Sequence, residues 1–375
     1  MPSVKRSKEF KSIYFIIPAP LGISPGQRFR FEHYLKFLQQ EGIHFAVSSF
    51  YSMNSWKILF TRGNLLRKIV AVFIGFFRRF FDLFRLISFD YIFIYREAAP
   101  IGPPVFEFLI SRVFGKKIIY DFDDAIWIPF LSKTNWLAFY LKFFSKIGTI
   151  CKWSYKISVG NSFLGDFAQR FNPNVVLIPT VVNTRDVHNG MQKHDTDKPV
   201  VGWTGSFSTL KFLDVIFPVL QRMQEKYDFE FIVIADNDPE LPLKRYRFIK
   251  WNKQTETEDL LKMHIGLMPL YDDDLTKGKC GFKAIQYMSL GIPPVVSAVG
   301  VNTEIVDDGV DGFVCHNDNE WELKMEYLLK DNEKRKVMGK HAREKIINKY
   351  SVEATKDTFL GLFADSMHGH LKKND

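Results

Sequence analysis

The sequence predicts an α/β protein made of two Rossmann-like domains in tandem. Short runs of β-branched and aromatic residues alternate with longer amphipathic stretches, which is typical of βαβ units and parallel sheets. The alternation stops at a polar segment, residues 183–199, and then starts again. Such a segment is typical of a linker between domains. With 375 residues, the chain is also long enough for two hydrophobic cores.

Twelve strands are expected, six on each side of the linker. The first six are 12–19, 44–50, 91–96, 117–122, 156–160 and 175–179. The second six are 200–205, 229–235, 246–251, 265–270, 293–297 and 312–315. The longest helices are expected at 27–42, 64–88, 209–227, 318–331, 333–349 and 352–368. Pro218 lies inside one of them, so we expect a kink there.

The composition is that of an ordered globular protein, with 46% hydrophobic and 25% charged residues. The three cysteines, Cys151, Cys280 and Cys315, have neither zinc spacing nor a disulfide framework, which favours a reducing, cytoplasmic compartment. The apolar stretch near the N-terminus is expected to be a strand and not a signal peptide. No apolar run reaches the ~18–20 residues that span a bilayer.

The net charge of +9 is concentrated in the first quarter of the chain. Residues 1–90 contain 14 Lys and Arg against 5 Asp and Glu, and the remainder is neutral overall. This asymmetry predicts an anionic partner for the first half. No nucleic-acid-binding signature is present, so we expect no nucleic acid among the partners and favour an anionic membrane surface.

The pattern of residues 64–88 is the reason for favouring a membrane surface. On a helix of about 100° per residue, Arg67, Arg78 and Arg85 fall near one line, and Lys68, Arg79 and Asp82 lie within roughly 120° of it. The remaining face is aliphatic and aromatic. This pattern predicts a helix lying in a membrane interface, so that the protein is peripheral on the inner face of the membrane. The alternative is a helix packed deep in the first domain, with its charges at the only wet edge. Gly75 is expected to weaken either helix by roughly 1 kcal/mol relative to Ala.

Two loops have the residues that hold anions. "GWTGSFSTLKFLD" (202–214) places Gly205 and Ser206 between a strand and a helix, with Lys211 in the first helical turn. "KGKCGFKAIQYMSLGIPPVVS" (277–297) places Lys279 and Lys283 at the mouth of a helix, where N–H groups and the helix dipole are positive. The alternatives are a tight turn in the first case and solvated lysines in the second.

Two further loops follow strands of the first half. "YDFDDAIW" contains Asp121, Asp123 and Asp124, which could chelate a metal, bind sugar hydroxyls or cap a helix. "PLGISPGQRFRFEHY" contains glycines followed by basic residues at a helix start, and suits an anion or an acceptor. The alternative is a glycine loop with a basic helix face. The residues in question are Gly22, Gly26, Arg28, Arg30 and His33.

Residues 200–315 resemble the donor-binding half of glycosyltransferase family 4, the retaining group 1 enzymes with the GT-B fold. "QYMSLGIPPVVSAVGVNTEIVDDGVDGFV" matches the family's helix and tail, and "GWTGSFSTLKFLD" is similar to its phosphate loop. The resemblance implies two Rossmann-like domains facing each other across a cleft. Residues 1–185 would be the acceptor side, 186–350 the donor side, and 351–375 a helix crossing back to the N-terminal domain.

The resemblance also implies a reaction. A sugar would move, with retention, from a nucleotide sugar to a glycan or lipid-linked acceptor in surface polysaccharide biosynthesis, without a cofactor or metal. The expected diphosphate ligands are Gly205, Ser206, Lys211, Lys279 and Lys283, with Gln286 on the ribose. Asp121, Asp123 and Asp124 stand where the family often has a His-Asp pair near the reacting sugar. Gly22, Gly26, Arg28, Arg30 and His33 would face the acceptor.

The sequence departs from the family at three positions. The family usually has two glutamates separated by seven residues, and here those positions are Gly278 and Gln286. Ser206 replaces the usual arginine of the phosphate loop. Lys279 and Lys283 are expected to replace that arginine's charge. The alternatives are a non-catalytic nucleotide-sugar-binding protein and a sugar-nucleotide epimerase. An NAD-dependent oxidoreductase is disfavoured, because neither half opens with Gly-x-Gly-x-x-Gly.

Overall fold

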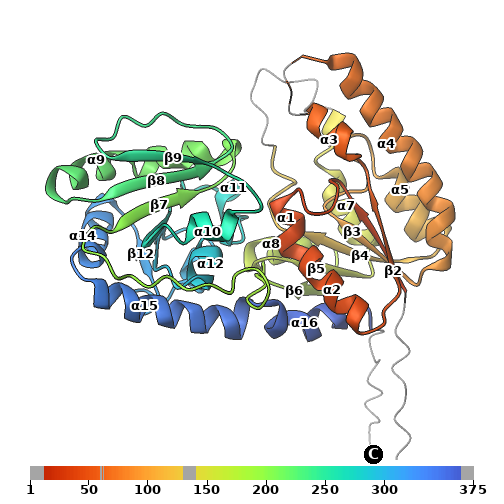
Figure 1. Ribbon diagram of the computed structural model, residues 1–375. Helices are drawn as coiled ribbons and strands as arrows, with labels where there is room; N and C mark the ends of the chain where they lie inside the picture. Colours follow the sequence, from red (N-terminus) through yellow and green to blue (C-terminus); the bar gives the residue numbers. More distant parts are fainter. Residues whose placement is uncertain (1–11, 60, 62, 130–140, 365–375) are drawn as a thin grey trace, which may run out of the picture.

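The chain forms two lobes, each built around a parallel β-sheet. The computed structural model describes residues 12–59, 61, 63–129 and 141–364 (Figure 1). The lobes lie side by side, with the N-terminal lobe formed by the first half of the chain and the C-terminal lobe by the second half (Figure 1). This arrangement confirms the predicted fold class.

The N-terminal sheet has six parallel strands in the order β2-β1-β3-β4-β5-β6. The strands are β1 (Ile13–Ile17), β2 (Phe45–Ser49), β3 (Tyr91–Tyr95), β4 (Lys117–Phe122), β5 (Lys156–Val159) and β6 (Val175–Leu177). Every residue of β1 and β3 is buried. Helices cover both faces of such a sheet, so its central strands are apolar throughout. The helices are α1 (Pro25–Gln27), α2 (His33–Gln40), α3 (Met53–Leu59), α4 (Leu65–Arg85), α5 (Val105–Phe108), α7 (Lys146–Trp153) and α8 (Ser162–Gln169).

The C-terminal sheet repeats this design, with six parallel strands in the order β12-β11-β10-β7-β8-β9. The strands are β7 (Val200–Thr204), β8 (Glu230–Ala235), β9 (Tyr246–Lys250), β10 (Ile265–Met268), β11 (Pro294–Ser297) and β12 (Phe313–Cys315). All twelve expected strands are therefore present. The helices are α9 (Phe217–Lys226), α10 (Glu256–Leu260), α11 (Asp274–Lys277), α12 (Phe282–Ser289), α13 (Asn302–Ile305), α14 (Asp318–Leu329), α15 (Asn332–Lys345) and α16 (Val352–Gly361).

Three expected helices differ from the prediction. The helix expected at 333–349 ends as α15 at Lys345 and continues as a π-helical turn at Ile346–Tyr350. Residues 27–42 are not one regular helix, because a π-helical turn at Arg28–Glu32 separates α1 from α2. The predicted kink at Pro218 is wrong. A 3₁₀ helix at Phe207–Val215 ends first, and α9 begins at Phe217 with Pro218 in its first turn. Proline is tolerated there because the first turn has no intrahelical partner for an N–H group.

The last helix, α16, leaves the C-terminal lobe and packs beneath the N-terminal lobe (Figure 1). The rings of Tyr34 and Phe359 stack with centroids 4.1 Å apart, and the hydroxyl groups of Tyr34 and Thr355 are 2.6 Å apart. The chain crosses between the lobes twice, and the two crossings are joined by backbone hydrogen bonds. Val182 N donates to Tyr350 O over 3.0 Å. The crossings therefore form one two-stranded connection between the lobes.

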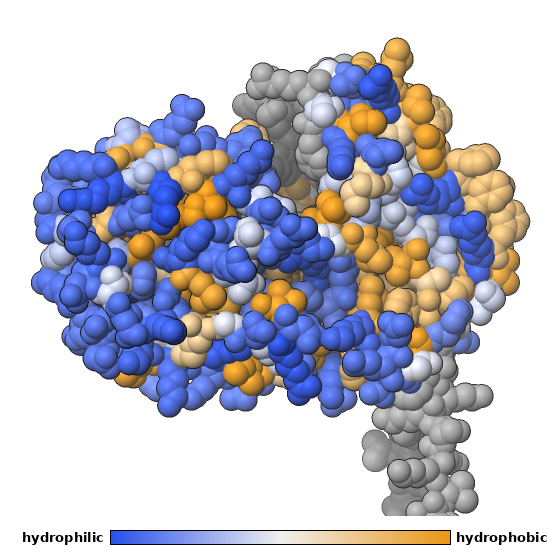
Figure 2. Space-filling view, viewed as in Figure 1, coloured by the Kyte–Doolittle hydropathy of each residue, from blue (hydrophilic) through white to orange (hydrophobic). Residues whose placement is uncertain are grey.

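Helix α4 is amphipathic as expected, but its polar side points inward. Arg79 and Asp82 are buried against the sheet, together with Ala71 and Gly75. The outer face exposes large hydrophobic side chains along the whole helix, and Figure 2 shows them at the outer edge of the N-terminal lobe. They are Leu65, Leu66, Ile69, Val70, Phe73, Ile74, Phe77, Phe80, Phe81 and Phe84. The alternative of a helix buried by its apolar face is therefore wrong.

The charged residues that were expected to form one stripe on α4 differ in their burial. Arg67 and Arg85 are exposed near the two ends of the apolar face. Arg78 is half-buried and donates to the backbone oxygen of Ser49 over 2.7 Å. None of the helices in the described part of the chain combines the length and the apolar character that a bilayer crossing requires.

Candidate active site

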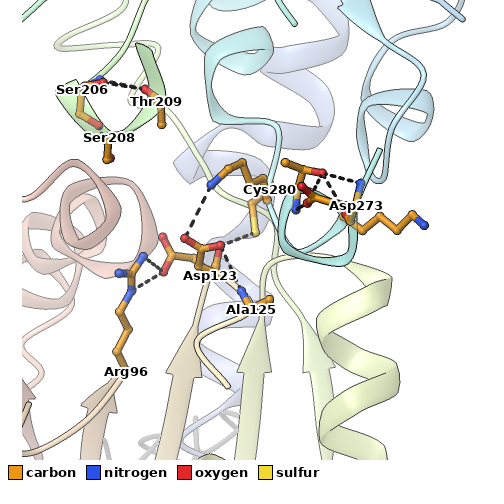
Figure 3. Close-up of polar contacts among 12 residues, drawn as sticks. Arg96, Asp123, Ala125, Ser206, Ser208, Thr209, Asp273 and Cys280 are labelled. Carbon is orange, nitrogen blue, oxygen red and sulfur yellow. Dashed lines mark hydrogen bonds and ion pairs between the residues drawn. The ribbon is translucent and has the colours of Figure 1, made fainter. Parts of the chain in front are cut away.

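The carboxyl ends of the two sheets meet between the lobes. The loop after β4, residues 123–125, touches the turn that leads into α12 (Figure 3). The thiol of Cys280 donates to the backbone oxygen of Asp123 over 3.2 Å. Asn161, at the end of β5, donates from Nδ2 to the backbone oxygen of Lys279 over 2.9 Å. Ligands of open parallel sheets bind beyond these strand ends, so this junction is the candidate site.

The first of the three expected catalytic aspartates, Asp121, is buried in the N-terminal core. Its carboxylate accepts two hydrogen bonds from Arg30, at 2.6 Å from Nη2 and 3.2 Å from Nε. Arg30 also donates to the backbone oxygen of Ile178 and to the hydroxyl of Ser158. The expectations that Asp121 acts on the substrate and that Arg30 faces the acceptor are contradicted, because each satisfies the other away from the cleft.

Asp123 is held by the end of β3. Tyr95 donates to it over 2.8 Å. Arg96 Nε donates to it over 2.9 Å (Figure 3). Burial acts to raise the pKa of Asp123, but the charges of Arg96 and Arg30 outweigh burial and lower that pKa below its usual value. Asp123 is therefore an ionised carboxylate with fixed partners. Arg96 has a φ of 61°, a left-handed conformation that non-glycine residues adopt at a cost.

Asp124 differs from both neighbours because its side chain is 30% exposed. One carboxylate oxygen accepts from the N–H of Ala125 over 3.1 Å. The other lies 3.8 Å from the ammonium of Lys279, across the junction between the lobes. Of the three aspartates, Asp124 has the most exposed side chain and is the one paired with a lysine of the other lobe.

The acceptor-side loop makes a contact between the lobes that the sequence did not predict. Arg28 is buried and forms an ion pair with Glu256, with Nη2 2.5 Å from Oε2. The indole N–H of Trp251 donates to the same carboxylate over 3.2 Å. Arg28 was expected to face the acceptor, but here its charge is used to join the lobes. A long-range partner such as Glu256 leaves no signal in the local sequence.

The remaining acceptor-side residues surround this pair. His33 is mostly buried beside the ring of Phe29, and burial lowers the pKa of His33 to about 3. It is therefore neutral and no anion ligand at physiological pH. Gly22 donates its N–H to Glu32 over 2.8 Å. Gly26 lies against Tyr95 and Asp123, where a Cβ atom would be 2.3 Å from the tyrosine oxygen.

The loop after β7 does not present the N–H groups that were expected to bind a phosphate. Gly205 N donates to the backbone oxygen of Ile234 over 3.0 Å. Ser206 N donates to the hydroxyl of Thr209 over 3.1 Å (Figure 3). Ser206 caps the 3₁₀ helix and so uses these groups locally. The side chain of Lys211 lies over the ring of Phe212, with its ammonium 5.4 Å from the centroid.

Lys279 and Lys283 form the cationic part of the site. The Lys283 ammonium lies over the ring of Trp203 at 5.2 Å, and that of Lys279 lies 5.8 Å from the centroid of Phe212. Burial, together with the charge of Lys279, lowers the pKa of Lys283 to about 7. No ion pair joins Lys283 to a carboxylate in the described part of the chain. A cation held without a counter-charge in a cleft is typical of a site for an anionic ligand.

Gln286 lies one turn further along α12, at the position expected to bind a ribose. Its side chain is almost completely buried, and its amide nitrogen has no partner among the described residues. Within the same residues, no group of three His, Cys, Asp or Glu side chains is placed to hold a metal ion.

Three residues of the site, Arg96, Asn161 and Trp203, were not predicted from the sequence. All three lie at or next to the carboxyl end of a strand, which is the signal that could have identified them.

The C-terminal lobe is similar to a known protein family. Residues 185–345 match the family model of the group 1 glycosyl transferases. A search of curated protein sequences gave no significant match.

Solved structures of several other proteins resemble nearly the whole chain. A sucrose-phosphate synthase from Thermosynechococcus elongatus aligns with a TM-score of 0.68 at 14% identity, over 94% of this chain and 98% of that chain. HepE from Anabaena, solved with UDP and glucose, aligns with a TM-score of 0.62 at 14% identity over the same shares. The catalytic domain of starch synthase IV from Arabidopsis thaliana, bound to ADP and acarbose, aligns with a TM-score of 0.63 at 11% identity, over 94% and 99%. At these identities the similarity shows a shared fold.

Proposed function

We propose that this chain, whose C-terminal lobe matches the family model of the group 1 glycosyl transferases, is a glycosyltransferase that moves a sugar with retention from a nucleotide sugar to a glycan or lipid-linked acceptor. The observation that carries the proposal is the pair Lys279 and Lys283 at the start of α12. Their charges repel each other and one of them is largely buried, so the pair is costly without an anion. A diphosphate would neutralise both.

The proposed chemistry follows from that charge. Breaking the bond between the sugar and the diphosphate leaves negative charge on the phosphate oxygens. Lys279, Lys283 and the positive end of the α12 dipole stabilise that charge as it develops. The acceptor would attack the same face that the diphosphate leaves, with a donor phosphate oxygen helping to remove its proton. No metal or other cofactor is part of this proposal.

The contacts between the lobes would exclude water during transfer, since hydrolysis competes with it. The contact of Cys280 with Asp123 and the ion pair of Arg28 with Glu256 both cross the junction. Two similar structures support a nucleotide-linked donor. HepE was solved with UDP and glucose, and starch synthase IV with ADP and acarbose.

The exposed face of α4 supports a place on an anionic membrane surface. Ten large hydrophobic side chains lie on this one helix, from Leu65 to Phe84, and they would be unfavourable in water. Arg67 and Arg85 lie near the ends of the face and would reach headgroups. We therefore propose a peripheral enzyme on the inner face of the membrane, acting in surface polysaccharide biosynthesis on a lipid-linked acceptor.

Thermal-shift measurements with UDP-, GDP-, ADP- and dTDP-sugars test the donor site. A ligand at ~100 times its Kd adds about 2.7 kcal/mol of stability, which is readily detected. We expect one nucleotide class to stabilise the wild type and not Lys283→Ala. Lys277→Ala is the matched control, because Lys277 is an exposed lysine two residues before Lys279 that pairs with Asp272. Equal shifts in the wild type and Lys283→Ala would overturn the proposed diphosphate site.

Product analysis separates transfer from its alternatives. A transferase releases the nucleotide only when acceptor is added. A sugar-nucleotide epimerase would interconvert sugar nucleotides without acceptor. A non-catalytic protein would bind the nucleotide sugar and release nothing in either assay, as the missing carboxylates at Gly278 and Gln286 would permit.

A further inference from the structure

We infer that Asp124, in the N-terminal lobe, supplies the carboxylate that the C-terminal lobe lacks at residue 278, and that it binds hydroxyl groups of the donor sugar. The inference rests on the proposed function, because it presupposes that Lys279 and Lys283 hold the diphosphate of a nucleotide sugar. It assigns Asp124 to sugar binding, in place of the catalytic role expected for all three aspartates.

The first observation is that residue 278 has no room for a side chain. A Cβ atom on residue 278 would lie 2.6 Å from the Cβ atom of Ala125 and 2.9 Å from its backbone nitrogen. No glutamate can occupy this position while the lobes are in contact, since backbone atoms cannot give way as a flexible side chain does. The absent acidic residue is therefore explained by the approach of the loop 123–125.

That approach is fixed on both sides of the turn. Asn161 donates from Nδ2 to the backbone oxygen of Lys277 over 3.2 Å and to that of Lys279 over 2.9 Å. Cys280 donates to the backbone oxygen of Asp123. The N-terminal lobe thus holds the turn at residues 277, 279 and 280, and Ala125 fills the space beside 278.

The same loop brings a carboxylate to the cationic site. Asp124 lies next to Ala125, and its free carboxylate oxygen is 3.8 Å from the Lys279 ammonium. Asp121 and Asp123 cannot take this role, because Arg30 and Arg96 hold them. The side chain of Asp124 remains 30% exposed.

The acidic loop before α12 also has its carboxylates engaged. Asp272 and Asp274 lie within ion-pair distance of Lys277, and Asp273 caps α11 by accepting from Thr276 N over 2.8 Å. Among the described residues of these two loops, Asp124 is therefore the carboxylate left beside Lys279.

The chemistry of a carboxylate decides what it binds there. An ionised carboxylate accepts hydrogen bonds and repels phosphate oxygens. The sugar of a nucleotide sugar is attached to the diphosphate and carries several hydroxyl donors. With the diphosphate on Lys279, the sugar is the part of the donor that Asp124 can bind. The sugar subsite is then complete only when the lobes are in contact.

Paired calorimetric titrations test this assignment. The probes are UDP with UDP-glucose, ADP with ADP-glucose, GDP with GDP-mannose and dTDP with dTDP-glucose, each measured on the full chain and on Asp124→Asn. For the pair that the wild type binds, we expect Asp124→Asn to weaken the nucleotide sugar about ten-fold or more. The nucleoside diphosphate should bind as well as before or more tightly, because the variant removes a competing charge from Lys279. Asp272→Asn is the matched control and should change neither.

The outcomes separate the inference from the function on which it rests. If Asp124→Asn binds the sugar nucleotide and the nucleoside diphosphate with unchanged preference, the inference is wrong and the diphosphate site stands. Equal weakening of both ligands would show that Asp124 only maintains contact between the lobes, and would also overturn it. If the wild type binds no probe of any pair, the proposed function and the inference fall together. Comparable melting temperatures of the variants establish that each is folded.

Discussion

Arg79 and Asp82 form an ion pair 2.7 Å long on the inner side of α4, with both side chains only 1% exposed. The carboxylate also accepts from Tyr14 and Ser48, each over 2.7 Å. Burial and the neighbouring carboxylate raise the pKa of Tyr14 to about 12, so it remains a donor. A fully satisfied polar network therefore fastens α4 to the sheet. The apolar face of the helix is left outside.

Removing one member of this network should be severe. Asp82→Ala leaves the Arg79 charge buried and unpaired, which typically costs about 3–5 kcal/mol of unfolding free energy. Urea denaturation followed by circular dichroism measures the loss. The double variant Arg79→Met, Asp82→Leu should lose less, since it leaves no buried charge. A loss in Asp82→Ala of less than ~1 kcal/mol would mean that the pair does not fasten the helix.

Gly75 gives a prediction opposite in sign to the one from helix propensity. A Cβ atom at residue 75 would lie 2.2 Å from the ring of Phe50. Gly75→Ala should therefore destabilise the protein by roughly 1–3 kcal/mol through overpacking, although alanine favours helices by about 1 kcal/mol. The double variant with Phe50→Leu should recover part of the loss. Stabilisation in the single variant would show that propensity alone governs the site.

The outer face of α4 should mediate vesicle binding. The triple variant Phe77→Ser, Phe80→Ser, Phe84→Ser changes only exposed side chains and should leave the melting temperature nearly unchanged. We expect the wild type to sediment with vesicles of phosphatidylglycerol and phosphatidylcholine, less so at high salt, and the variant to stay in the supernatant. Leu323→Ser is the control, because Leu323 is equally exposed on α14 of the other lobe. Cosedimentation of the triple variant would contradict the membrane role.

These features show what the sequence could and could not predict. The strands were found because a parallel sheet covered on both faces makes its strands continuously apolar, as in Tyr91–Tyr95. The helical wheel showed that α4 is amphipathic, but it grouped Arg67 and Arg85, which are exposed, with Arg79 and Asp82, which are buried. It could not predict which face points inward, because the partners of Asp82, Tyr14 and Ser48, lie 68 and 34 residues away.

The same limit applies to the site. The run "YDFDDAIW" located an acidic loop at a strand end, which the structure places beside the lysines of α12. It could not rank the three aspartates, because the partner of Asp121 is Arg30, 91 residues earlier in the chain. Small residues at 205 and 206 suggested free N–H groups. The hydroxyl of Thr209 and the backbone oxygen of Ile234 accept from them instead.

Two buried histidines near the connection between the lobes should make the protein acid-labile. Burial, followed by nearby positive groups, lowers the pKa of both His33 and His188 from 6.5 to about 3. The unfolded chain therefore takes up protons at higher pH than the folded one. Their contribution is present above pH ~6.5 and is lost as the pH falls toward 3, with a slope of up to about 2.7 kcal/mol per pH unit for the two.

Urea midpoints at pH 5 and pH 7.5 measure this slope. His188→Phe should reduce the slope of the unfolding free energy with pH by up to about 1.4 kcal/mol per pH unit, which corresponds to one proton fewer taken up on unfolding. Phenylalanine should fit this site, because the ring of His188 already packs against Phe29 and is uncharged there. His341→Gln, at an exposed site, is the control and should leave the slope unchanged. An unaltered slope in His188→Phe would mean that other groups cause the acid sensitivity.

Lys283 should couple donor binding to proton uptake. Burial, followed by the charge of Lys279, lowers the pKa of Lys283 from 10.5 to about 7, so at pH 8.5 the side chain of the empty protein is mostly neutral. A diphosphate favours the charged form and raises this pKa again. Binding at pH 8.5 should therefore take up close to one proton, and affinity should fall by up to tenfold per pH unit above 7. Titration of the nucleoside diphosphate in buffers with different ionisation enthalpies measures the uptake directly. The diphosphate itself is fully ionised at this pH, so its own protonation does not contribute.

Lys277→Ala should keep the proton uptake on binding, while Lys283→Met should lose it and bind the nucleoside diphosphate more weakly. In the empty protein, Lys283→Met should also raise the melting temperature below pH ~7, where the wild type must bury the charge. Undiminished proton uptake in Lys283→Met would assign the linkage to another group and remove the main support for the diphosphate site at α12.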